Sequence, residues 1–548
     1  MDSIKKLREI LRGDIEDSTK TRSTYSHDAS LFEIKPEAVV FPKDSEDLCK
    51  LVKFVASQKN EQPELSLTAR SGGTDMSGGA INNSIIVAFE RYFNHLGEVS
   101  NGLITTQPGV YYHDFEPKTL AQNLLMPSYP ASREICMMGG IVSNNSGGEK
   151  SLIYGKTIDY VKQVKVVLAD GNEYTFGPIN REQLDEKLMA PGLEGEIYRS
   201  VYTLVAEHAQ LIKDAKPKVS KNSTGYNIWD VWDGTTFDLS KLIVGAQGTL
   251  GLITEATFSL VPAKPLSGMM VVFMKSLDNL SDVVKSLLPL KPSSLESFDD
   301  HTLRFAFRFF YTFRKTLGWK KFIFLAISFI PIIDNMLRFL PHFPKLVILV
   351  EFEGETQDEI DAKLVAVEKS LEPFDVDTQL AEDKKHEEKF WIMRRESFNL
   401  LRKNVKRKHT APFIDDLIVQ PTDLPEFLPR LIKILDKYKL LYTIAGHVGD
   451  GNFHVIPLMD LSDPREREKI PLVLEEAVPL ILEYGGSLSG EHNDGLIRGP
   501  FLKRMYSPEI MMMFKKIKNA FDPLNIFNPH KKIDADWDYS KNHIRRGF

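Results

Sequence analysis

Two short segments near the C-terminal end concentrate side chains that could bind a metal ion and move a proton. They are GHVGDGNFH at residues 446–454 and SGEHNDG at residues 489–495. His447 and His454 suit a single metal ion if the chain turns back between them, and the glycines between them allow such a turn. With Glu491 they form a three-ligand set with an open position, which is typical of a catalytic metal.

His492 directly follows the candidate ligand Glu491. An imidazole at this position could take a proton from a group that the metal polarises. Zinc, manganese and ferrous iron all accept two imidazoles and a carboxylate, so the ligand types leave the identity of the divalent metal open. The simpler interpretation, one structural loop histidine in each segment, also stays open.

Four glycine-bearing segments lie upstream, and together they indicate a long ligand that carries a pyrophosphate. Backbone N–H groups free of side chains form anion-binding nests, and small residues let the chain approach a flat ring system. The spacing fits neither the Rossmann nor the Walker A pattern, so a dinucleotide would be held in a non-Rossmann fold. Tight turns explain one such segment but poorly explain four. The segments are RSGGTDMSGGA (70–80), QPGV (107–110), GGIVSNNSGGEKSLIYGKTIDYV (139–161) and GAQGTLGLIT (245–254).

Strands and helices alternate around these glycine segments, a pattern of α/β or α+β proteins. Helices are expected at 4–12, at 45–58 with Ser45 as its cap, and from residue 112 onward. Between about 263 and 480 the strands become longer, as in KLVILVEFEG at 345–354, which indicates a second, inserted domain. The earlier strands are expected at 38–42, 65–70, 83–89 and 102–110.

The composition excludes several classes of protein. The chain has 548 residues, is 42% hydrophobic and carries a net charge of −6, so nothing global indicates nucleic-acid binding. Two cysteines, Cys49 and Cys136, cannot supply the four thiolates of an iron–sulfur cluster, and they fit a reducing compartment. The charged N-terminus lacks the apolar core of a secretory signal, so a cytoplasmic location is expected.

Residues 301–345 depart from this average. They hold eight Lys or Arg, one acid (Asp334) and 10 of the 33 phenylalanines. A basic amphipathic helix near 304–317 would precede an uncharged run at 322–333, which is too short to cross a bilayer. This pattern favours peripheral contact with the inner face of a membrane, with a hydrophobic partner surface or an ordinary core helix pair as alternatives.

In this order, the segments resemble the FAD-linked oxidase family, also called the vanillyl-alcohol-oxidase or PCMH-type flavoproteins. The resemblance covers 36–262 and 345–531, and GHVGDGNFH followed by GEH is specific to the D-lactate dehydrogenase, glycolate oxidase and D-2-hydroxyglutarate dehydrogenase branch. It implies an α+β fold in which a cap domain is inserted into a two-part PCMH-type FAD-binding domain. The implied units are an N-terminal helical extension (1–35), the FAD-binding domain (36–262), an α+β cap or substrate domain (263–480) and a C-terminal segment completing the FAD site (481–548).

The resemblance also implies which residues bind the cofactor. The first glycine segment would cradle the FAD pyrophosphate, and Thr74 stands where some relatives carry a covalently linked histidine, so the FAD is expected to be non-covalent. The later segments would flank the ring, the ribityl chain and the adenine half. The implied FAD contacts are Arg70, Ser71, Gly72, Gly73, Thr74, Asp75, Ser77, Gly78, Pro108, Gly109, Gly139, Gly140, Ser143, Asn144, Gly147, Tyr154, Gly155, Gly248, Gly251, Ile253 and Asn528.

The implied reaction is oxidation of a D-2-hydroxy acid to the 2-oxo acid by hydride transfer to flavin N5. The metal would bind the hydroxyl and the carboxylate, and His492 would remove the hydroxyl proton. Arg394 in WIMRRES (391–397) matches the family's carboxylate-binding position, and its neighbour Arg395 could exchange roles with it; surface salt bridges are the alternative. Tyr226 in STGYN (223–227) matches a family motif near the site, or serves packing.

Two departures from the hydroxyglutarate enzymes favour a small monocarboxylate such as D-lactate or glycolate, or a larger hydrophobic 2-hydroxy acid. Asp415 stands where those enzymes carry a lysine and would repel a second carboxylate, and Ile456 stands where they carry an asparagine. The electron acceptor is expected to be external, a membrane quinone or a redox protein. Two other functions stay open: a transferase similar to alkyl-dihydroxyacetonephosphate synthase, and a non-catalytic flavoprotein subunit of a membrane redox complex.

Overall fold

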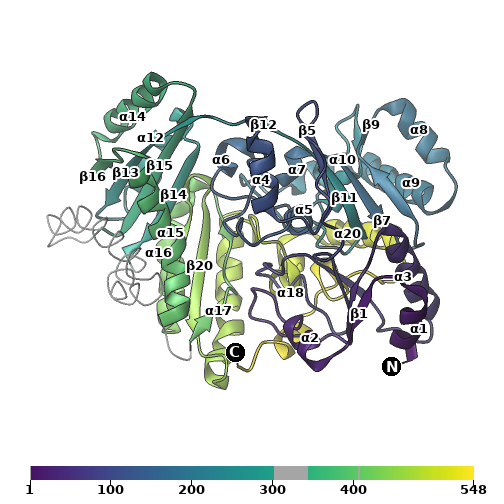
Figure 1. Ribbon diagram of the computed structural model, residues 1–548. Coiled ribbons are helices and arrows are strands. Elements are labelled where there is room, and N and C mark those ends of the chain that lie inside the picture. Colours follow the sequence, from purple (N-terminus) through teal and green to yellow (C-terminus); the bar gives the residue numbers. More distant parts are fainter. Residues whose placement is uncertain (1, 301–343, 405–407, 548) are drawn as a thin grey trace.

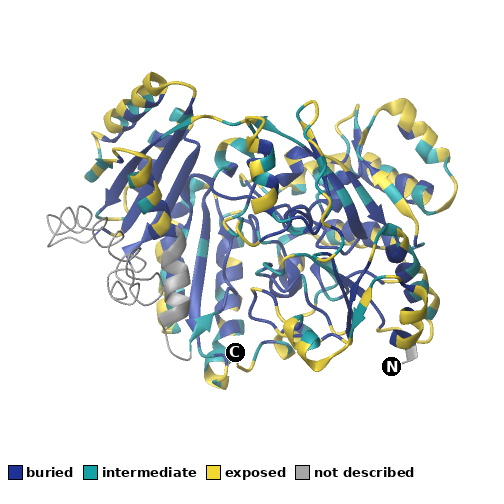
Figure 2. Cartoon of the chain, in the orientation of Figure 1, coloured by how far each residue is buried: buried dark blue, intermediate teal, exposed yellow. Residues whose placement is uncertain are grey.

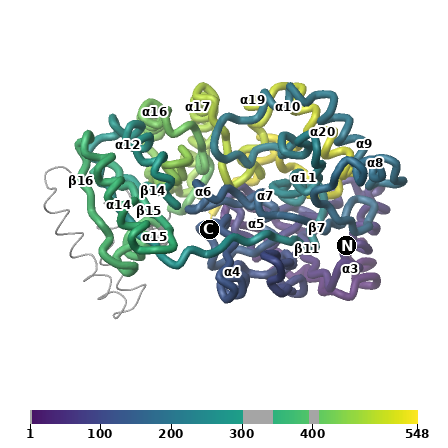
Figure 3. Tube along the Cα trace, turned by 90° about the horizontal axis from the view of Figure 1, so that it is seen from above, coloured from purple at the N-terminus to yellow at the C-terminus, as the bar shows by residue number. Residues whose placement is uncertain are grey.

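A computed structural model describes residues 2–300, 344–404 and 408–547, with side chains undescribed at 2 and 395–404. Two sheet-containing parts lie side by side, and the C-terminal segment returns from the second part to the first (Figures 1 and 3). Nearly all of the predicted basic insertion at 301–345, including the expected helix near 304–317, lies outside the described residues, as does the side chain of Arg395.

The N-terminal part contains two four-stranded sheets. In the first, of order β1-β2-β4-β3, the strands β2, β4 and β3 are parallel and β1 is antiparallel to β2. In the second, of order β5-β11-β7-β8, all neighbours are antiparallel. Their bounds are β1 Asp14–Glu16, β2 Ala38–Phe41, β3 Leu67–Arg70, β4 Ile85–Ala88, β5 Leu103–Thr106, β7 Val161–Val167, β8 Glu173–Phe176 and β11 Leu252–Ser259; two-residue strands are β6 Leu124–Leu125, β9 Pro178–Ile179, β10 Phe237–Asp238 and β12 Val261–Pro262.

Helices cover the outer faces of these sheets, with their exposed sides toward solvent (Figure 2). Helix α3 has the predicted bounds, but its cap is Asp44 and not Ser45. Asp44 has an extended backbone and accepts a hydrogen bond from the Asp47 N–H at 3.2 Å, whereas Ser45 already lies in the first turn. The helices are α1 Asp2–Ile10, α2 Thr19–Thr24, α3 Ser45–Gln58, α4 Tyr112–Leu120, α5 Met138–Asn144, α6 Ser151–Tyr154, α7 Thr157–Tyr160, α8 Arg181–Met189, α9 Gly192–Glu207, α10 Ala209–Ala215 and α11 Ser240–Ile243.

The second part is built on an eight-stranded antiparallel sheet of order β16-β13-β15-β14-β19-β20-β17, with β18 paired to β20. The predicted strand at 345–354 is the interior strand β15, between β13 and β14, and a single large apolar core joins this sheet to its helices. The strands are β13 Leu266–Met274, β14 Ser294–Asp299, β15 Leu346–Gly354, β16 Val376–Leu380, β17 His409–Thr410, β18 Leu417–Ile418, β19 Leu441–His447 and β20 Asn452–Met459; the helices are α12 Leu280–Leu287, α14 Gln357–Leu371, α15 Lys384–Asn404, α16 Leu424–Lys437 and α17 Pro464–Glu483.

The C-terminal segment returns to the N-terminal part and shares its core. Helix α20 packs against α9, and Phe527 pairs with Leu67 at the edge of the first sheet (Figure 1). The three main sheets and the helices that cover them confirm the predicted α+β class. None of the described helices combines the length and the hydropathy that crossing a bilayer demands. The helices of this segment are α18 Gly495–Arg498, α19 Leu502–Met505, α20 Pro508–Phe521 and α21 Trp537–Asn542.

Candidate active site

A tight hairpin brings the two predicted histidine ligands together. His447 ends β19 and His454 lies in β20, the adjacent antiparallel strand, with their ring centroids 5.2 Å apart. Of the two glycines expected to permit the turn, Gly451 has the positive φ of 72°. A side chain there would also meet the Val419 carbonyl oxygen at 2.0 Å. The predicted turn is therefore present and depends on glycine at this position.

Glu491 approaches this hairpin from the loop that follows α17. Its Oε1 lies 3.2 Å from His447 Nε2, and suitable ligand atoms of Glu491, His447 and His454 all lie within 4.8 Å of one another. The structure thus gathers the three predicted ligands, and their donor set fits a divalent cation. Metal binding itself stays a prediction.

His492 lies next to His454. The two rings are stacked, with centroids 4.9 Å apart. Burial lowers the pKa of His492, but the negative charges of Asp415 and Asp416 outweigh burial and raise it to about 9. In the metal-free protein His492 therefore holds its proton at neutral pH, and a cation bound nearby would oppose this by adding positive charge.

Carboxylates contact the Nδ1 atoms of all three imidazoles. Glu296 Oε1 lies 2.5 Å from His447 Nδ1, while the two oxygens of Asp415 contact His454 and His492. Burial lowers the pKa of His447, but Glu296 and Glu491 raise it to about 9. Glu296 projects from the buried strand β14 and was not among the site residues predicted from the sequence; an acid in the otherwise apolar or small-residue start of SLESFD was its available signal.

A buried lysine neutralises the Glu491 side of the cluster. Lys221 Nζ lies 2.5 Å from Glu491 Oε1 and 3.1 Å from Asp450 Oδ2, and its side chain is 2% exposed. Burial raises the pKa of Glu491, but the positive charges of His447 and Lys221 outweigh burial and lower it well below its usual range. The sequence carried no local signal for Lys221, which lies 270 residues from Glu491.

Arg394 lies beside the histidine cluster, as predicted. It projects from α15, is buried, and forms an ion pair with the same Glu296 carboxylate that contacts His447. Tyr226 does not join the cluster. Its hydroxyl is 2.8 Å from Thr249 Oγ1 and its ring packs against Phe514, so packing accounts for this residue.

The interpretation of Asp415 as a residue that repels a second substrate carboxylate is wrong. Its side chain is fully buried and both carboxylate oxygens are taken by His454 and His492. Positive neighbours also lower its pKa against the effect of burial, so its charge is compensated. Ile456, the second departure, lies in β20 two residues beyond His454 and is nearly buried.

The first predicted cofactor loop folds around Asp75. This carboxylate accepts hydrogen bonds from the N–H groups of Ser77 and Gly79, and from Asn144 Nδ2 at 3.0 Å. In the described part of the chain, the N–H groups of Gly72 and Gly73 meet no acceptor. A short stretch of free amides in a glycine turn fits the pyrophosphate of a dinucleotide.

Three predicted loops meet at this turn. A side chain on Gly139 would meet Pro108 Cβ at 2.5 Å and Ser71 Oγ at 2.6 Å, whereas one on Gly140 would point into open space. Asn528 of the C-terminal segment donates to the carbonyl of Gly79 at 2.8 Å, which ties both ends of the chain together. A flat cofactor could thus lie over Gly140.

The cofactor loops adjoin the histidine cluster. A side chain at Gly147 would lie 3.4 Å from Glu491 Oε1, and Asn493 Nδ2 donates to the Gly245 carbonyl at 2.8 Å. Lys156, buried in the same region, donates to the Gly490 carbonyl at 2.7 Å. A ring bound along residues 139–147 would therefore lie next to the predicted metal ligands.

Other predicted cofactor contacts have structural partners. Tyr154 donates to Glu353 of β15 at 3.1 Å, a contact between the two sheet-containing parts. Gly251 packs against Val166, and Ile253 lies buried in β11 opposite the same residue. The remaining predicted contacts line the loops described above or their borders: Arg70, Thr74, Gly78, Gly109, Ser143, Gly155 and Gly248.

Two family models match the chain. The FAD binding domain model matches residues 36–177, and the model of the FAD linked oxidases' C-terminal domain matches residues 267–532. The chain belongs to the FAD-linked oxidases. Two solved structures have the same PCMH-type fold at 15% identity: p-cresol methylhydroxylase (TM-score 0.69, covering 98% of this chain and 97% of that one) and 4-ethylphenol oxidase from Gulosibacter chungangensis (TM-score 0.68, covering 98% of each).

Curated relatives of this FAD-linked oxidase are named as dehydrogenases or oxidases of 2-hydroxy acids. A D-2-hydroxyglutarate dehydrogenase of Pantoea ananatis is 28% identical over 95% of this chain and 50% of its own length. A glycolate oxidase subunit GlcD of Bacillus subtilis is 26% identical over 95% of this chain and 94% of its own. The chain spans about half the length of the first curated relatives that it matches.

Proposed function

We propose that this FAD-linked oxidase oxidises a D-2-hydroxy acid to the 2-oxo acid. The observation that carries the proposal is the convergence of His447, His454, Glu491 and His492 beside Gly147 of a predicted cofactor loop. Arg394 adds a carboxylate-binding cation at the same place. The names of the curated relatives support the same reaction class.

The residues of the site would have different roles in this reaction. When bound, FAD would supply the hydride acceptor, and a divalent metal held by His447, His454 and Glu491 would supply a Lewis acid for the substrate hydroxyl. His492 would accept the hydroxyl proton at Nε2, because its Nδ1 already faces Asp415. Arg394 would orient the substrate carboxylate, exchanging part of its contact with Glu296 for it.

The substrate is proposed to be a small monocarboxylate such as D-lactate or glycolate. Ile456 supports this substrate class, because its apolar side chain two residues beyond His454 offers no hydrogen bond to a second carboxylate. The curated relatives named D-2-hydroxyglutarate dehydrogenase give the opposite expectation. A higher kcat/KM for D-2-hydroxyglutarate than for D-lactate would refute the monocarboxylate proposal.

The test is anaerobic mixing of the FAD-loaded protein with a panel of D- and L-2-hydroxy acids, followed by flavin absorbance. Bleaching by one D-acid is expected, with loss of bleaching in Glu491→Gln and His492→Ala. His208→Ala, at the end of α9 outside the cluster, is the matched control and should bleach normally. Absence of bleaching in FAD-loaded wild type would refute the dehydrogenase and favour the transferase or the non-catalytic subunit.

Electrons are proposed to leave the reduced cofactor for an external quinone or redox protein. The basic, phenylalanine-rich composition of residues 301–345 supports contact with the inner face of a membrane, where quinones reside. Deleting 301–345 should abolish co-sedimentation with anionic liposomes and leave bleaching by substrate intact. Unchanged co-sedimentation of the deletion variant would contradict the membrane proposal.

A further inference from the structure

One carboxylate connects the predicted base to a predicted metal ligand. Asp415 lies in the loop between β17 and β18, and its side chain has no exposed surface. Its Oδ1 is 3.1 Å from His454 Nδ1 and its Oδ2 is 2.5 Å from His492 Nδ1. The two rings stack with an angle of 20° between their planes, and they contact different oxygens of the same carboxylate.

We propose that Asp415 is a positioning residue that sets the tautomer and orientation of both imidazoles. This inference rests on the proposed function, because it gives His454 the role of ligand and His492 that of base. An ionised carboxylate has no proton to donate, so each Nδ1 must carry the hydrogen of its contact. Each neutral ring then presents an unprotonated Nε2, the atom that binds a metal or takes a proton.

The same residues could be considered as a second metal site, since Asp415, His454 and His492 also lie close together. The distances argue against it. Two ligands of one tetrahedral ion, each about 2.0–2.1 Å from it, lie roughly 3.3 Å apart. The 2.5 Å separation between Asp415 Oδ2 and His492 Nδ1 is therefore a direct hydrogen bond, with no room for an ion between the atoms.

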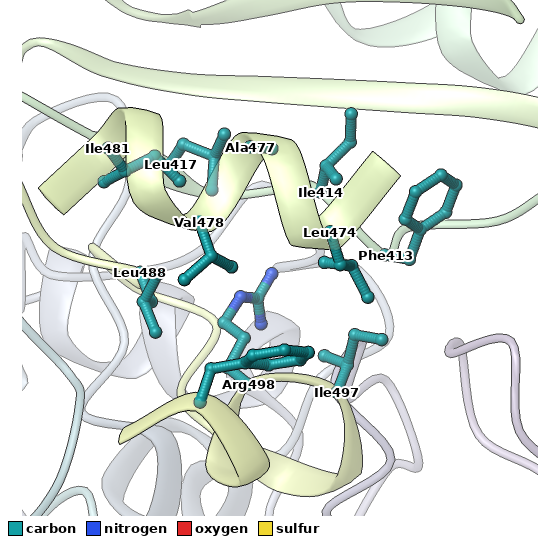
Figure 4. A pocket seen from close by; sticks show the side chains of 11 residues that line it. Phe413, Ile414, Leu417, Leu474, Ala477, Val478, Ile481, Leu488, Ile497 and Arg498 are labelled. Atoms are coloured by element: carbon teal, nitrogen blue, oxygen red, sulfur yellow. The ribbon is translucent and has the colours of Figure 1, made fainter. Parts of the chain in front are cut away.

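Asp415 is itself held rigidly. Arg498 donates to its backbone carbonyl at 2.6 Å and to the Asn493 carbonyl at 2.8 Å. The Arg498 guanidinium lies among apolar side chains of α17 and the neighbouring loops, which keep it away from solvent (Figure 4). A buried guanidinium needs its hydrogen bonds, so the Arg498 contacts fix the Asp415 main chain.

The next residue, Asp416, has a different task. Its carboxylate accepts the N–H of Glu491 at 2.9 Å and the N–H of His492 at 2.7 Å, and thereby fixes the loop that carries them. Asp416 also accepts from the side chains of Ser489 and Asn452, so it holds the loop, whereas Asp415 holds the two imidazoles. This division makes Asp415→Asn a selective change, because the loop contacts of Asp416 stay in place.

The experiment compares wild type, Asp415→Asn and Glu296→Gln as full-length protein by NMR of ¹⁵N-labelled histidine. In metal-free wild type, at a pH high enough for both rings to be neutral, the Nδ1 atoms of His454 and His492 should carry the ring proton and the Nε2 atoms should not. Asn keeps one acceptor and turns the other into a donor, so one of these two rings should lose its Nδ1–H tautomer. Glu296→Gln is the matched control and should alter the His447 signal alone.

Two further measurements complete the test. Equilibrium dialysis with Zn²⁺ should show a 10- to 100-fold weaker affinity in Asp415→Asn, the usual effect of losing such a partner. The pH profile of flavin bleaching should also shift. The inference would be overturned if a neutral ring of either histidine in wild type carried its proton on Nε2. It would also be overturned if Asp415→Asn left the tautomers of both rings and the Zn²⁺ affinity unchanged.

The outcomes separate this inference from the proposed function. The tautomers are read in wild type without substrate, so they stay informative if Asp415→Asn fails to fold. If both Nδ1 protons are present and no hydroxy acid bleaches the flavin, the proposed function fails and the positioning role stands. If bleaching occurs and the tautomers differ from expectation, the positioning role alone fails.

Discussion

Replacing Lys221 by Met tests the charge balance of the candidate site. The lysine Nζ contacts Glu491 at 2.5 Å and Asp450 at 3.1 Å, and the side chain is 2% exposed. Met keeps an unbranched stem of similar length and removes the ammonium, so the main effect is two carboxylates left without their cation. Removing one partner of a buried ion pair costs about 3–5 kcal/mol.

Lys221→Met should therefore lower the free energy of unfolding of the metal-free protein by about 3–5 kcal/mol. The measurement is urea unfolding in EDTA, followed by tryptophan fluorescence. Lys532→Met is the matched control, because Lys532 is equally buried and its Nζ lies 2.8 Å from Asp494. Both variants should lose stability in EDTA.

Zinc should separate the two variants. A divalent cation at Glu491 replaces the missing positive charge, so Zn²⁺ should restore stability in Lys221→Met to a larger extent than in Lys532→Met. A loss below about 1 kcal/mol for Lys221→Met in EDTA would refute the charge reasoning. An equal effect of Zn²⁺ on both variants would refute a cation site at Glu491.

Three other substitutions test the cofactor loops and a buried acid. Gly140→Ala enters open space in α5, so it should preserve stability yet reduce the flavin absorbance per protein; full flavin content would contradict a ring over Gly140. Gly73→Ala should lower both flavin content and melting temperature, because φ is +65° and the new Cβ would meet the Arg70 guanidinium at 2.4 Å; unchanged flavin would reject the cradle. Burial raises the pKa of Glu351 to about 8, so the folded chain keeps a proton that the unfolded chain releases above its ordinary pKa of 4.5. Stability should fall as pH rises through this window, and urea unfolding should find that slope smaller in Glu351→Gln; an equal slope would contradict the shift.

Local sequence predicted the elements well where one pattern fixed the answer. The helix at 45–58 and the strand at 345–354 follow from hydrophobic periodicity, and the structure reproduces both within a residue. The sequence predicts Ser45 as the cap of that helix, whereas the structure has Asp44. Both residue types cap helices, and the backbone angles decide between them.

Residue types and spacing were enough to identify the reactive groups: two histidines on a glycine hairpin, a Glu-His pair and several glycine loops. The neighbours of these groups became visible only in the folded chain. Glu296 and Lys221 reach the cluster from positions 151 and 270 residues away from their partners, and Asp415 turns its carboxylate toward the histidines. Such contacts depend on how strands and loops pack in space, and no local residue pattern encodes that packing.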